Sequence, residues 1–454
     1  MKRIIILMLA CAMVFSAVAS SSATEFKVSG TLDMAFEFLD NPDPISADNG
    51  DYFQALQRLR TKIDIIANES LKGVYYLEVG SIYWGQGGGS SAGPLTGRTG
   101  PGSGGALGTD GVNVETKRMY IDYQMPNTAL SIRMGLQGLA LPSLANNNPV
   151  LDDDVAAVVA NYAFTDQYNV VAAWARAADT SNLGNTSNDK YDVFALIAGL
   201  NFEPVTIVPY AAYATIGRNA DIHSTDGTNL LGTKDRDVWY VGLSAKSNYW
   251  ENLNLAMDFM WGRSDDAGIS AANAAANPEV ASIREQSGFY VLLHGDYKME
   301  SFTPTLDLWY SSGDEDGLNS DGNLLPEISA GGLALTNLGT DGGFYDTTDN
   351  AFTTSGIGTM GVVLGITEVT FIENVTHDFK VAWMQGTSDY SSTGAVDQFP
   401  TDEDRAWEFN FDTNWQMYEN LAAILEIGYL NPDYESVSDE EAVWKAALGF
   451  QYSY

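Results

Sequence analysis

The amino-acid sequence predicts an all-β fold, a transmembrane barrel of antiparallel, up-and-down strands. Apolar and polar residues alternate over long stretches, and the connections between those stretches alternate between short and long. No stretch after residue 23 approaches eighteen consecutive apolar residues. An oblique membrane strand needs about 9–11 residues and a membrane helix about 20 apolar ones, so a closed barrel is the spanning structure that remains.

The amino-acid composition excludes several classes of protein and kinds of site. The chain of 454 residues carries 59 acidic and 23 basic side chains, which gives a formal charge of −36. This excess argues against a nucleic-acid partner, because a polyanion needs a basic surface. A hydrophobic fraction of 45% argues against a disordered acidic chain. The single cysteine excludes disulfide scaffolds and cysteine-ligated metal sites.

The first 23 residues predict a secretory signal peptide. Lys2 and Arg3 precede a short apolar run, which is followed by small residues. Cleavage is expected after Ala23 or after Ala19. Residues 24–454 are then expected to form a single barrel domain outside the cytoplasm.

The strands follow from period-2 alternation. The first segment, Phe26 to Phe38, places apolar residues at even positions over thirteen residues, where a soluble strand has about five or six. The same pattern predicts eighteen strands, with sixteen as the alternative. Their expected ranges are 26–38, 52–66, 71–84, 114–124, 129–137, 155–165, 169–178, 190–202, 205–216, 237–248, 253–263, 287–299, 302–312, 356–372, 377–388, 405–416, 421–430 and 441–454.

The connections fall into two classes. Short ones such as Glu203-Pro204 and Glu300-Ser301 alternate with long polar ones such as 217–236 and 313–355. Short periplasmic turns and long extracellular loops are typical of outer-membrane barrels.

Cations gather on one face of the early strands. In the segment 52–66, arginines and a lysine alternate with apolar residues. Exposing one such cation to lipid costs about 2–4 kcal/mol near the middle of the bilayer. These side chains must therefore line the lumen. By the same argument, the arginines of the strands 114–124 and 129–137 are predicted to face the lumen as well. We call these five residues the basic wall: Arg58, Arg60, Lys62, Arg118 and Arg133. Either they form a selective basic surface, or nearby carboxylates neutralise them.

The third long connection, Gly138 to Asp154, is unusually apolar and ends in Asp152, Asp153 and Asp154. In a loop exposed to water, Leu141 and Leu144 would remain unburied, whereas in a loop folded into the lumen they can pack against the barrel wall. The three acids would then face the basic wall at a pore constriction, with a transverse field between them.

At this point the chain resembles the outer-membrane homotrimeric porin family of sulfate-reducing bacteria, within the general trimeric porin superfamily. The resemblance rests on three segments, TEFKVSGTLDMAFEF, RLRTKIDIIANESLKG and MYIDYQMPNTALSIRMGLQGLALP. It implies a homotrimer, an inward-folded third loop, and diffusion of small hydrophilic solutes. It also implies that Asp152 to Asp154 are the loop acids, facing Arg58, Arg60 and Arg133. The end of the chain resembles the C-terminal insertion signal of outer-membrane barrels, carried by Gly449, Phe450, Tyr452 and Tyr454.

The function predicted from the sequence is a water-filled channel for passive diffusion of small hydrophilic solutes and ions, not an enzyme. The alternatives are a structural or adhesive barrel with a plugged lumen, which loop 313–355 is long enough to occlude, and a barrel hydrolase using His294. The expected location is the outer membrane of a Gram-negative bacterium, with outer-membrane lipid and lipopolysaccharide around the barrel. No cofactor or metal site is predicted, apart from divalent cations that the acidic loops would bind. The transported solute and the sign of ion selectivity stay open.

Overall fold

The computed structural model describes residues 24–42, 50–85, 105–106, 114–179, 190–217, 234–266, 285–315, 322–345, 351–389, 400–435 and 440–454. The predicted signal peptide, residues 1–23, lies outside these ranges. All eighteen predicted strands are found in a single sheet, and every pair of neighbours is antiparallel. Within the described ranges, no helix is both long and apolar enough to cross a membrane.

The strands have bounds within a few residues of those predicted, and β6 begins earlier than expected. In chain order they are β1 (Glu25–Asp40), β2 (Tyr52–Asn68), β3 (Leu71–Tyr83), β4 (Val114–Gln124), β5 (Leu130–Ala140), β6 (Asp152–Ala163), β7 (Tyr168–Asp179), β8 (Lys190–Phe202), β9 (Val205–Ile216), β10 (Arg236–Trp250), β11 (Leu253–Ser264), β12 (Gln286–Tyr297), β13 (Thr303–Ser311), β14 (Thr359–Ile372), β15 (Val375–Gly386), β16 (Arg405–Tyr418), β17 (Leu421–Asp433) and β18 (Val443–Ser453).

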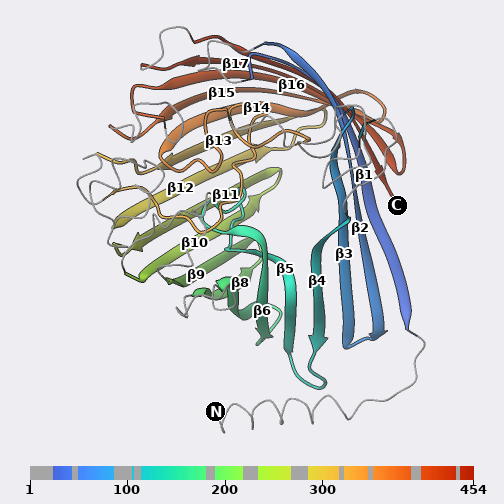
Figure 1. The fold of residues 1–454 in the computed structure, drawn as a ribbon, viewed down its shortest axis with the longest axis vertical. Helices are drawn as coiled ribbons and strands as arrows, with labels where there is room; N and C mark the ends of the chain where they lie inside the picture. Colours follow the sequence, from blue (N-terminus) through green and yellow to red (C-terminus); the bar gives the residue numbers. More distant parts are fainter. Residues whose placement is uncertain are drawn as a thin grey trace.

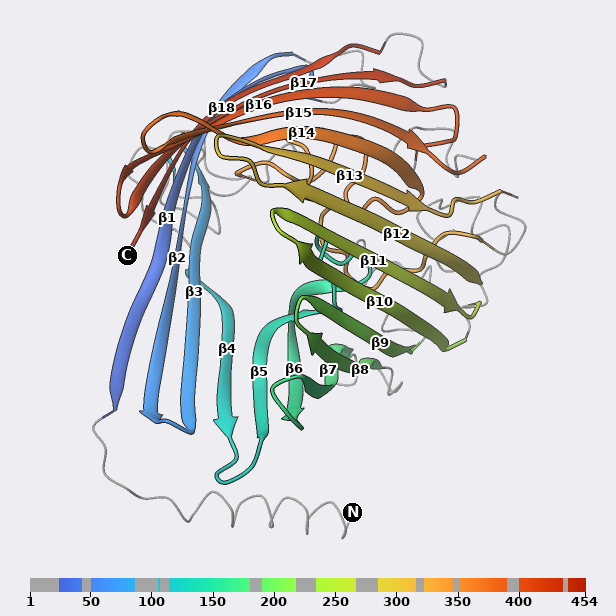
Figure 2. The same ribbon diagram turned by 180° about the vertical axis from the view of Figure 1, so that it is seen from behind.

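The sheet closes on itself because β1 pairs with both β2 and β18 (Figures 1 and 2). At the closing seam, the Gly30 N–H donates to the Tyr454 carbonyl at 3.0 Å, and the Tyr454 N–H donates to the Gly30 carbonyl at 3.1 Å. A Cβ at position 30 would lie 2.7 Å from the Tyr454 hydroxyl oxygen, so glycine leaves room for that ring. The barrel therefore has eighteen strands rather than sixteen.

Up-and-down pairing places all short connections at one rim and all long connections at the other. We call these the short-turn rim and the long-loop rim. The short connections include Glu69-Ser70 between β2 and β3 and Glu203-Pro204 between β8 and β9. The predicted segregation of connections by length is confirmed.

The outer face of the barrel is apolar and carries two belts of exposed aromatic side chains. One belt lies near the long-loop rim and includes Phe38, Phe53, Trp239, Trp261, Trp407 and Trp444. The other lies near the short-turn rim and includes Phe164, Tyr168, Tyr249, Trp250, Phe371 and Tyr418. Exposed aliphatic residues such as Leu196, Val241 and Leu364 lie between them. Such belts mark the two interfaces of a membrane around a barrel.

Two connections fold into the barrel. Loop L3, residues 141–151 between β5 and β6, confirms the prediction of an inward third loop. The described parts of loop L7 between β13 and β14, residues 312–315, 322–345 and 351–358, also fold inward, which the sequence suggested only for the plugged alternative (Figures 1 and 2). Buried residues of both loops, among them Val150 of L3 and Leu333 of L7, share one apolar cluster with the inner wall.

Candidate functional site

The basic wall lies on the inner face of the barrel. Arg58 pairs in register with Asp33 of β1, and both share the inner face with the fully buried Leu56. On the opposite face, Phe53 and Ile65 are exposed to the outside. The period-2 argument therefore assigned the cations of β2 to the correct face.

Most cations of the wall have a carboxylate partner on a neighbouring strand or on their own strand. Arg60 Nε lies 2.6 Å from Glu78 Oε2 of β3, and Lys62 Nζ lies 3.3 Å from Asp64 Oδ2. Arg133 of β5 donates two hydrogen bonds to Asp122 of β4, at 2.6 and 3.1 Å. The wall is thus a surface of alternating charges, as in the neutralised alternative.

A lysine links two of these pairs, Lys62–Asp64 and Arg133–Asp122, into a network. Lys72 Nζ lies 3.6 Å from Asp64 Oδ1 and 3.4 Å from Asp122 Oδ2. Because Asp64 and Asp122 each contact two cations, the network runs without a break from Lys62 of β2 to Arg133 of β5.

Arg58 has a different partner. Its guanidinium carbon lies 4.5 Å from the ring centroid of Tyr345, which L7 brings across the lumen. Within the described part of the chain, the buried Arg58 Nε has no hydrogen-bond partner. Burial raises the pKa of the Tyr345 phenol, so the ring stays neutral beside the cation near neutral pH. A cation over an aromatic face is stabilised by the ring quadrupole.

The three predicted loop acids are not in a loop. Asp152, Asp153 and Asp154 are the first residues of β6, because the ladder with β5 extends to Ala140. Asp154 accepts from Arg118 Nε at 2.6 Å and lies 3.0 Å from Lys117 Nζ. Of the predicted base–acid pairs, Arg118 and Asp154 are in direct contact.

A single carboxylate on the wall holds the tip of L3. Asp258 of β11 is 1% exposed and accepts from the Leu144 and Ala145 N–H groups, both at 2.9 Å. It also accepts from Ser143 Oγ at 2.6 Å and from the hydroxyl of Ser244. Two consecutive backbone N–H groups thus converge on one buried carboxylate.

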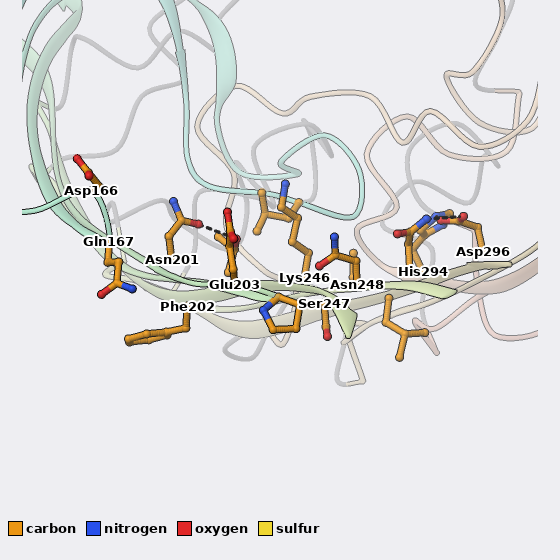
Figure 3. A pocket seen from close by; sticks show the side chains of 16 residues that line it. Asp166, Gln167, Asn201, Phe202, Glu203, Lys246, Ser247, Asn248, His294 and Asp296 are labelled. Atoms are coloured by element: carbon orange, nitrogen blue, oxygen red, sulfur yellow. Dashed lines mark hydrogen bonds and ion pairs between the residues drawn. The ribbon is translucent and has the colours of Figure 1, made fainter. Parts of the chain in front are cut away.

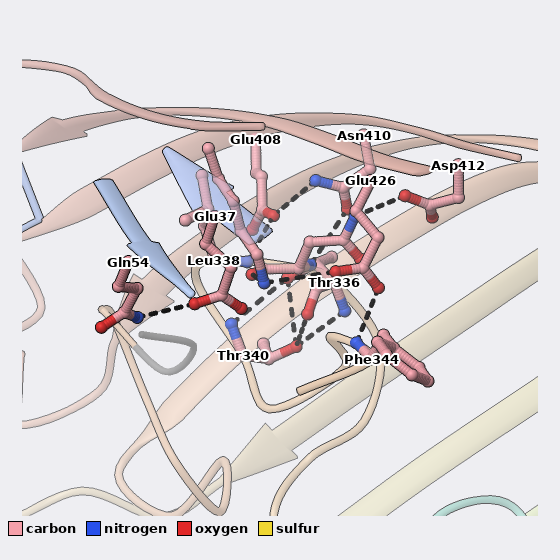
Figure 4. Close-up of polar contacts among 12 residues, drawn as sticks. Glu37, Gln54, Thr336, Leu338, Thr340, Phe344, Glu408, Asn410, Asp412 and Glu426 are labelled. Atoms are coloured by element: carbon pink, nitrogen blue, oxygen red, sulfur yellow. Dashed lines mark hydrogen bonds and ion pairs between the residues drawn. The ribbon is translucent and has the colours of Figure 1, made fainter. Parts of the chain in front are cut away.

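L7 is held in the same way on the other side of the lumen (Figure 4). Glu408 of β16 accepts from the Leu338 N–H at 3.0 Å and the Gly339 N–H at 2.9 Å. Nearby, Glu426 of β17 accepts from the Phe344 N–H at 2.6 Å. Glu426 also lies 3.4 Å from Lys445 Nζ, whose side chain is fully buried.

The two loops bind each other as well as the wall. The Gly331 N–H donates to the Asn148 carbonyl at 2.9 Å, and the Ser329 N–H donates to the Val150 carbonyl at 3.1 Å. Ser329 Oγ donates to Asp153 Oδ2 at 2.7 Å. L3 and L7 therefore form one partition that narrows the lumen between opposite walls.

Two cavities lie along the inner wall beside this partition. One, of about 680 Å³, is lined by the network residues Lys72, Asp122 and Arg133. The other, of about 830 Å³, is lined by Leu144 of L3, by the turn between β6 and β7, and by residues of β8 to β12 with their short turns (Figure 3). Both volumes are in the range of small-molecule sites.

The second cavity contains the histidine that the sequence singled out. His294 is on the inner face of β12, with Nδ1 2.6 Å from Asp307 Oδ1 and Nε2 3.4 Å from Asp296 Oδ2. The ring makes no hydrogen bond to a serine hydroxyl within the described residues. Those residues also contain no group of three or more His, Cys, Asp or Glu side chains arranged to hold a metal ion.

The residues of the predicted insertion signal lie on both faces of β18. Tyr452 and Tyr454 are exposed on the outer face, and Phe450 packs edge-on against Phe36 with ring centroids 6.5 Å apart. Gly449 faces inward, where a Cβ would lie 2.5 Å from the ring of Phe344. Glycine there leaves room for L7 against the wall.

No protein-family model matches the chain, and no curated protein matches it in sequence. Solved structures do match it in fold over nearly the whole chain. OccAB1 of Acinetobacter baumannii is 13% identical, with 94% of this chain and 96% of that chain covered and a TM-score of 0.55.

Two structures from Pseudomonas aeruginosa match similarly. OccK2 (OpdF), solved in complex with glucuronate, is 11% identical over 94% of this chain and 98% of its own, with a TM-score of 0.56. OpdK, solved with vanillate, is 10% identical over the same shares, with a TM-score of 0.53. At such identities the similarity establishes the fold, that of the eighteen-stranded OprD and Occ barrels.

Proposed function

We propose that the chain is a bacterial outer-membrane porin, exported by a cleaved signal peptide, through which small hydrophilic solutes and ions diffuse passively. The observation that carries this proposal is the contrast between the two faces of one closed barrel. The outer face is apolar with two aromatic belts, whereas the inner face carries a charged network and two cavities. The short-turn rim is then periplasmic, and lipopolysaccharide surrounds the long-loop rim.

The solutes bound in two similar barrels support a polar cargo. Glucuronate, in OccK2, and vanillate, in OpdK, are both small carboxylates. Arg60 and the network cations Lys72 and Arg133 would interact with such a group through charge-assisted hydrogen bonds. We propose that this network, Arg58 and Arg60 form one side of the constriction, with Asp152 to Asp154 and Arg118 at its long-loop end. We also propose that the barrel assembles as a homotrimer and is not an enzyme.

A planar-bilayer recording of the folded protein tests the channel. We expect discrete conductance steps that close in threes, with a defined reversal potential under a salt gradient. Folding is checked separately by the shift in gel mobility on heating. A heat-modifiable protein without conductance would contradict the channel.

The partition made by L3 and L7 favours a second candidate, a structural barrel with a plugged lumen. The apolar cluster that both loops share with the wall makes the partition a packed body rather than a loose loop. In that case the wild-type barrel would be silent, and shortening L7 would create the conductance. A wild-type barrel that already conducts excludes this candidate.

A further inference from the structure

The larger cavity contains an open row of side chains directly below the anchored tip of L3. The strand registers place Thr206 of β9 opposite Lys246, Lys246 opposite Ala256, and Ala256 opposite His294. On β11, Asp258, which holds L3, lies two residues beyond Ala256 in the direction of the long-loop rim. The row therefore lies one step beyond the partition, toward the short-turn rim.

At one end of the row, Lys246 places a positive charge in the cavity. Lys246 is exposed within the cavity, and its ammonium group makes no hydrogen bond or ion pair with any residue that the structure describes. Figure 3 shows Lys246 and Asn201 pointing to the same side of the wall, toward L3, while Phe202 points away. The other cations facing the lumen from β2 to β5 have carboxylate or aromatic partners, so Lys246 differs from them.

The other end of the row carries negative charge. His294 lies between Asp307, which is 6% exposed, and Asp296. Asp296 Oδ1 accepts from Asn254 Nδ2 at 2.8 Å, which fixes the carboxylate at the cavity wall. With two carboxylates and one imidazole, this end is negative even when the imidazole is protonated.

The centre of the row is a recess. Ala256 separates Lys246 from His294 by two strand spacings, about 10 Å between backbones. The methyl side chain of Ala256 leaves this span unfilled, and Leu144 of L3 covers it from above. A flexible lysine and a fixed carboxylate thus face each other across a space of small-molecule size.

We propose that this row is a binding subsite for a small zwitterionic solute. Lys246 binds the carboxylate of the solute, and Asp296, held by Asn254 and His294, binds its ammonium group. The recess above Ala256 holds the chain that joins the two charges. The subsite is on the wall opposite the basic network, and it rests on the proposed function only because the solute must be able to enter the lumen.

Calorimetric titration of the folded, full-length protein with 4-aminobutyrate at low salt tests the subsite. We expect Lys246→Met and Asp296→Asn each to weaken binding about tenfold or more, the effect of losing one charge-assisted hydrogen bond. Ala256→Phe should abolish binding by filling the recess while both charges remain. Lys234→Met is the matched control, because Lys234 is at the long-loop rim, 3.9 Å from Asp266. Each variant must keep the mobility shift on heating.

Two comparison solutes sharpen the test. Butyrate and butylammonium each carry one of the two charges, and each should bind about tenfold more weakly than 4-aminobutyrate. Butyrate binding as tightly as the zwitterion would overturn the proposal in favour of a simple anion site. Absence of binding, or equal binding by wild type and by Lys246→Met and Asp296→Asn, would also overturn it.

Conductance separates this inference from the channel itself. A conducting barrel without Lys246-dependent binding contradicts the subsite alone. A silent barrel that binds 4-aminobutyrate through Lys246 and Asp296 supports the subsite and contradicts passive conduction.

Discussion

Individual carboxylates on the inner wall hold the inward loops. Asp258 is almost fully buried and accepts four hydrogen bonds, two of them from consecutive backbone N–H groups of L3. A buried charge is tolerated only when it is fully hydrogen-bonded, so the loop and the carboxylate depend on each other.

We therefore predict that Asp258→Ala releases L3. Losing these charge-assisted hydrogen bonds should cost about 3 kcal/mol of loop docking. Limited proteolysis should then cut within residues 141–151, and single-channel conductance should rise. Asp51→Asn, at an exposed position directly before β2, is the control. Protease resistance equal to that of wild type would show that apolar packing alone holds L3.

A second prediction at this scale concerns Gly30. A side chain there would collide with the Arg60 carbonyl and with the Tyr454 ring at the seam between β1 and β18. We expect Gly30→Val to prevent closure, which appears as loss of the heat-dependent shift in gel mobility. Gly50→Ala is the matched control, since a Cβ at Gly50 meets no atom within 4 Å. A normal shift in Gly30→Val would mean that the seam can open to admit a side chain.

Particular residues show how far the sequence predicted the site. Alternation correctly turned Arg58, Arg60 and Arg133 inward, because each strand has only two faces. Alternation could not predict that Arg60 pairs with Glu78, because that ion pair depends on the register between β2 and β3. The register includes an irregularity between Gln57 and Leu59, which period-2 reasoning does not contain.

At the scale of elements, all eighteen strands were predictable and one of the two inward loops was missed. The apolar character of L3 was recognised, whereas L7 was treated as a long polar loop that enters the lumen only in the plugged alternative. Its signal was present in Leu333, Leu335 and Leu338, which are all buried. They follow neither a strand nor a helix period, because a loop packs by shape rather than by a repeating face.

L7 should respond to the loss of its own anchor. Glu408→Ala removes the acceptor for the Leu338 and Gly339 N–H groups, while Lys445 and Glu426 still hold the Phe344 end. We predict partial release, seen as noisier current and a modest rise in conductance. Glu403→Ala, at the exposed long-loop rim, serves as the control. An unchanged current would indicate that L7 does not border the conducting path.

The two loops also bind each other, so their anchors should be coupled. We predict that the effects of Asp258→Ala and Glu408→Ala on conductance are not additive. Contacts such as Ser329 to Val150 and Gly331 to Asn148 transmit the release of one loop to the other. A double-mutant cycle measures this coupling. Additive effects would show that L3 and L7 act as separate constrictions.

For the whole molecule, the open question is whether overall or local charge governs ion selectivity. The formal charge of the chain is −36, yet the inner wall carries Arg60 and the network cations Lys72 and Arg133. Salt screens charges beyond about 10 Å at 0.1 M and beyond about 3 Å at 1 M, so distant loop acids should contribute less than the network.

We therefore predict that Arg133→Met shifts the reversal potential toward cations and that Asp122→Asn shifts it toward anions. The shifts oppose each other because the two side chains form one pair in the lumen, with Arg133 Nε 2.6 Å from Asp122 Oδ1. Lys234→Met removes the same charge at the long-loop rim and should have a much smaller effect at 0.1 M salt. Raising the salt to 1 M should abolish the effect of the rim variant and retain most of that of the lumen variants. If Lys234→Met shifts the potential as much as Arg133→Met, overall charge governs selectivity, and the network serves only to stabilise the wall.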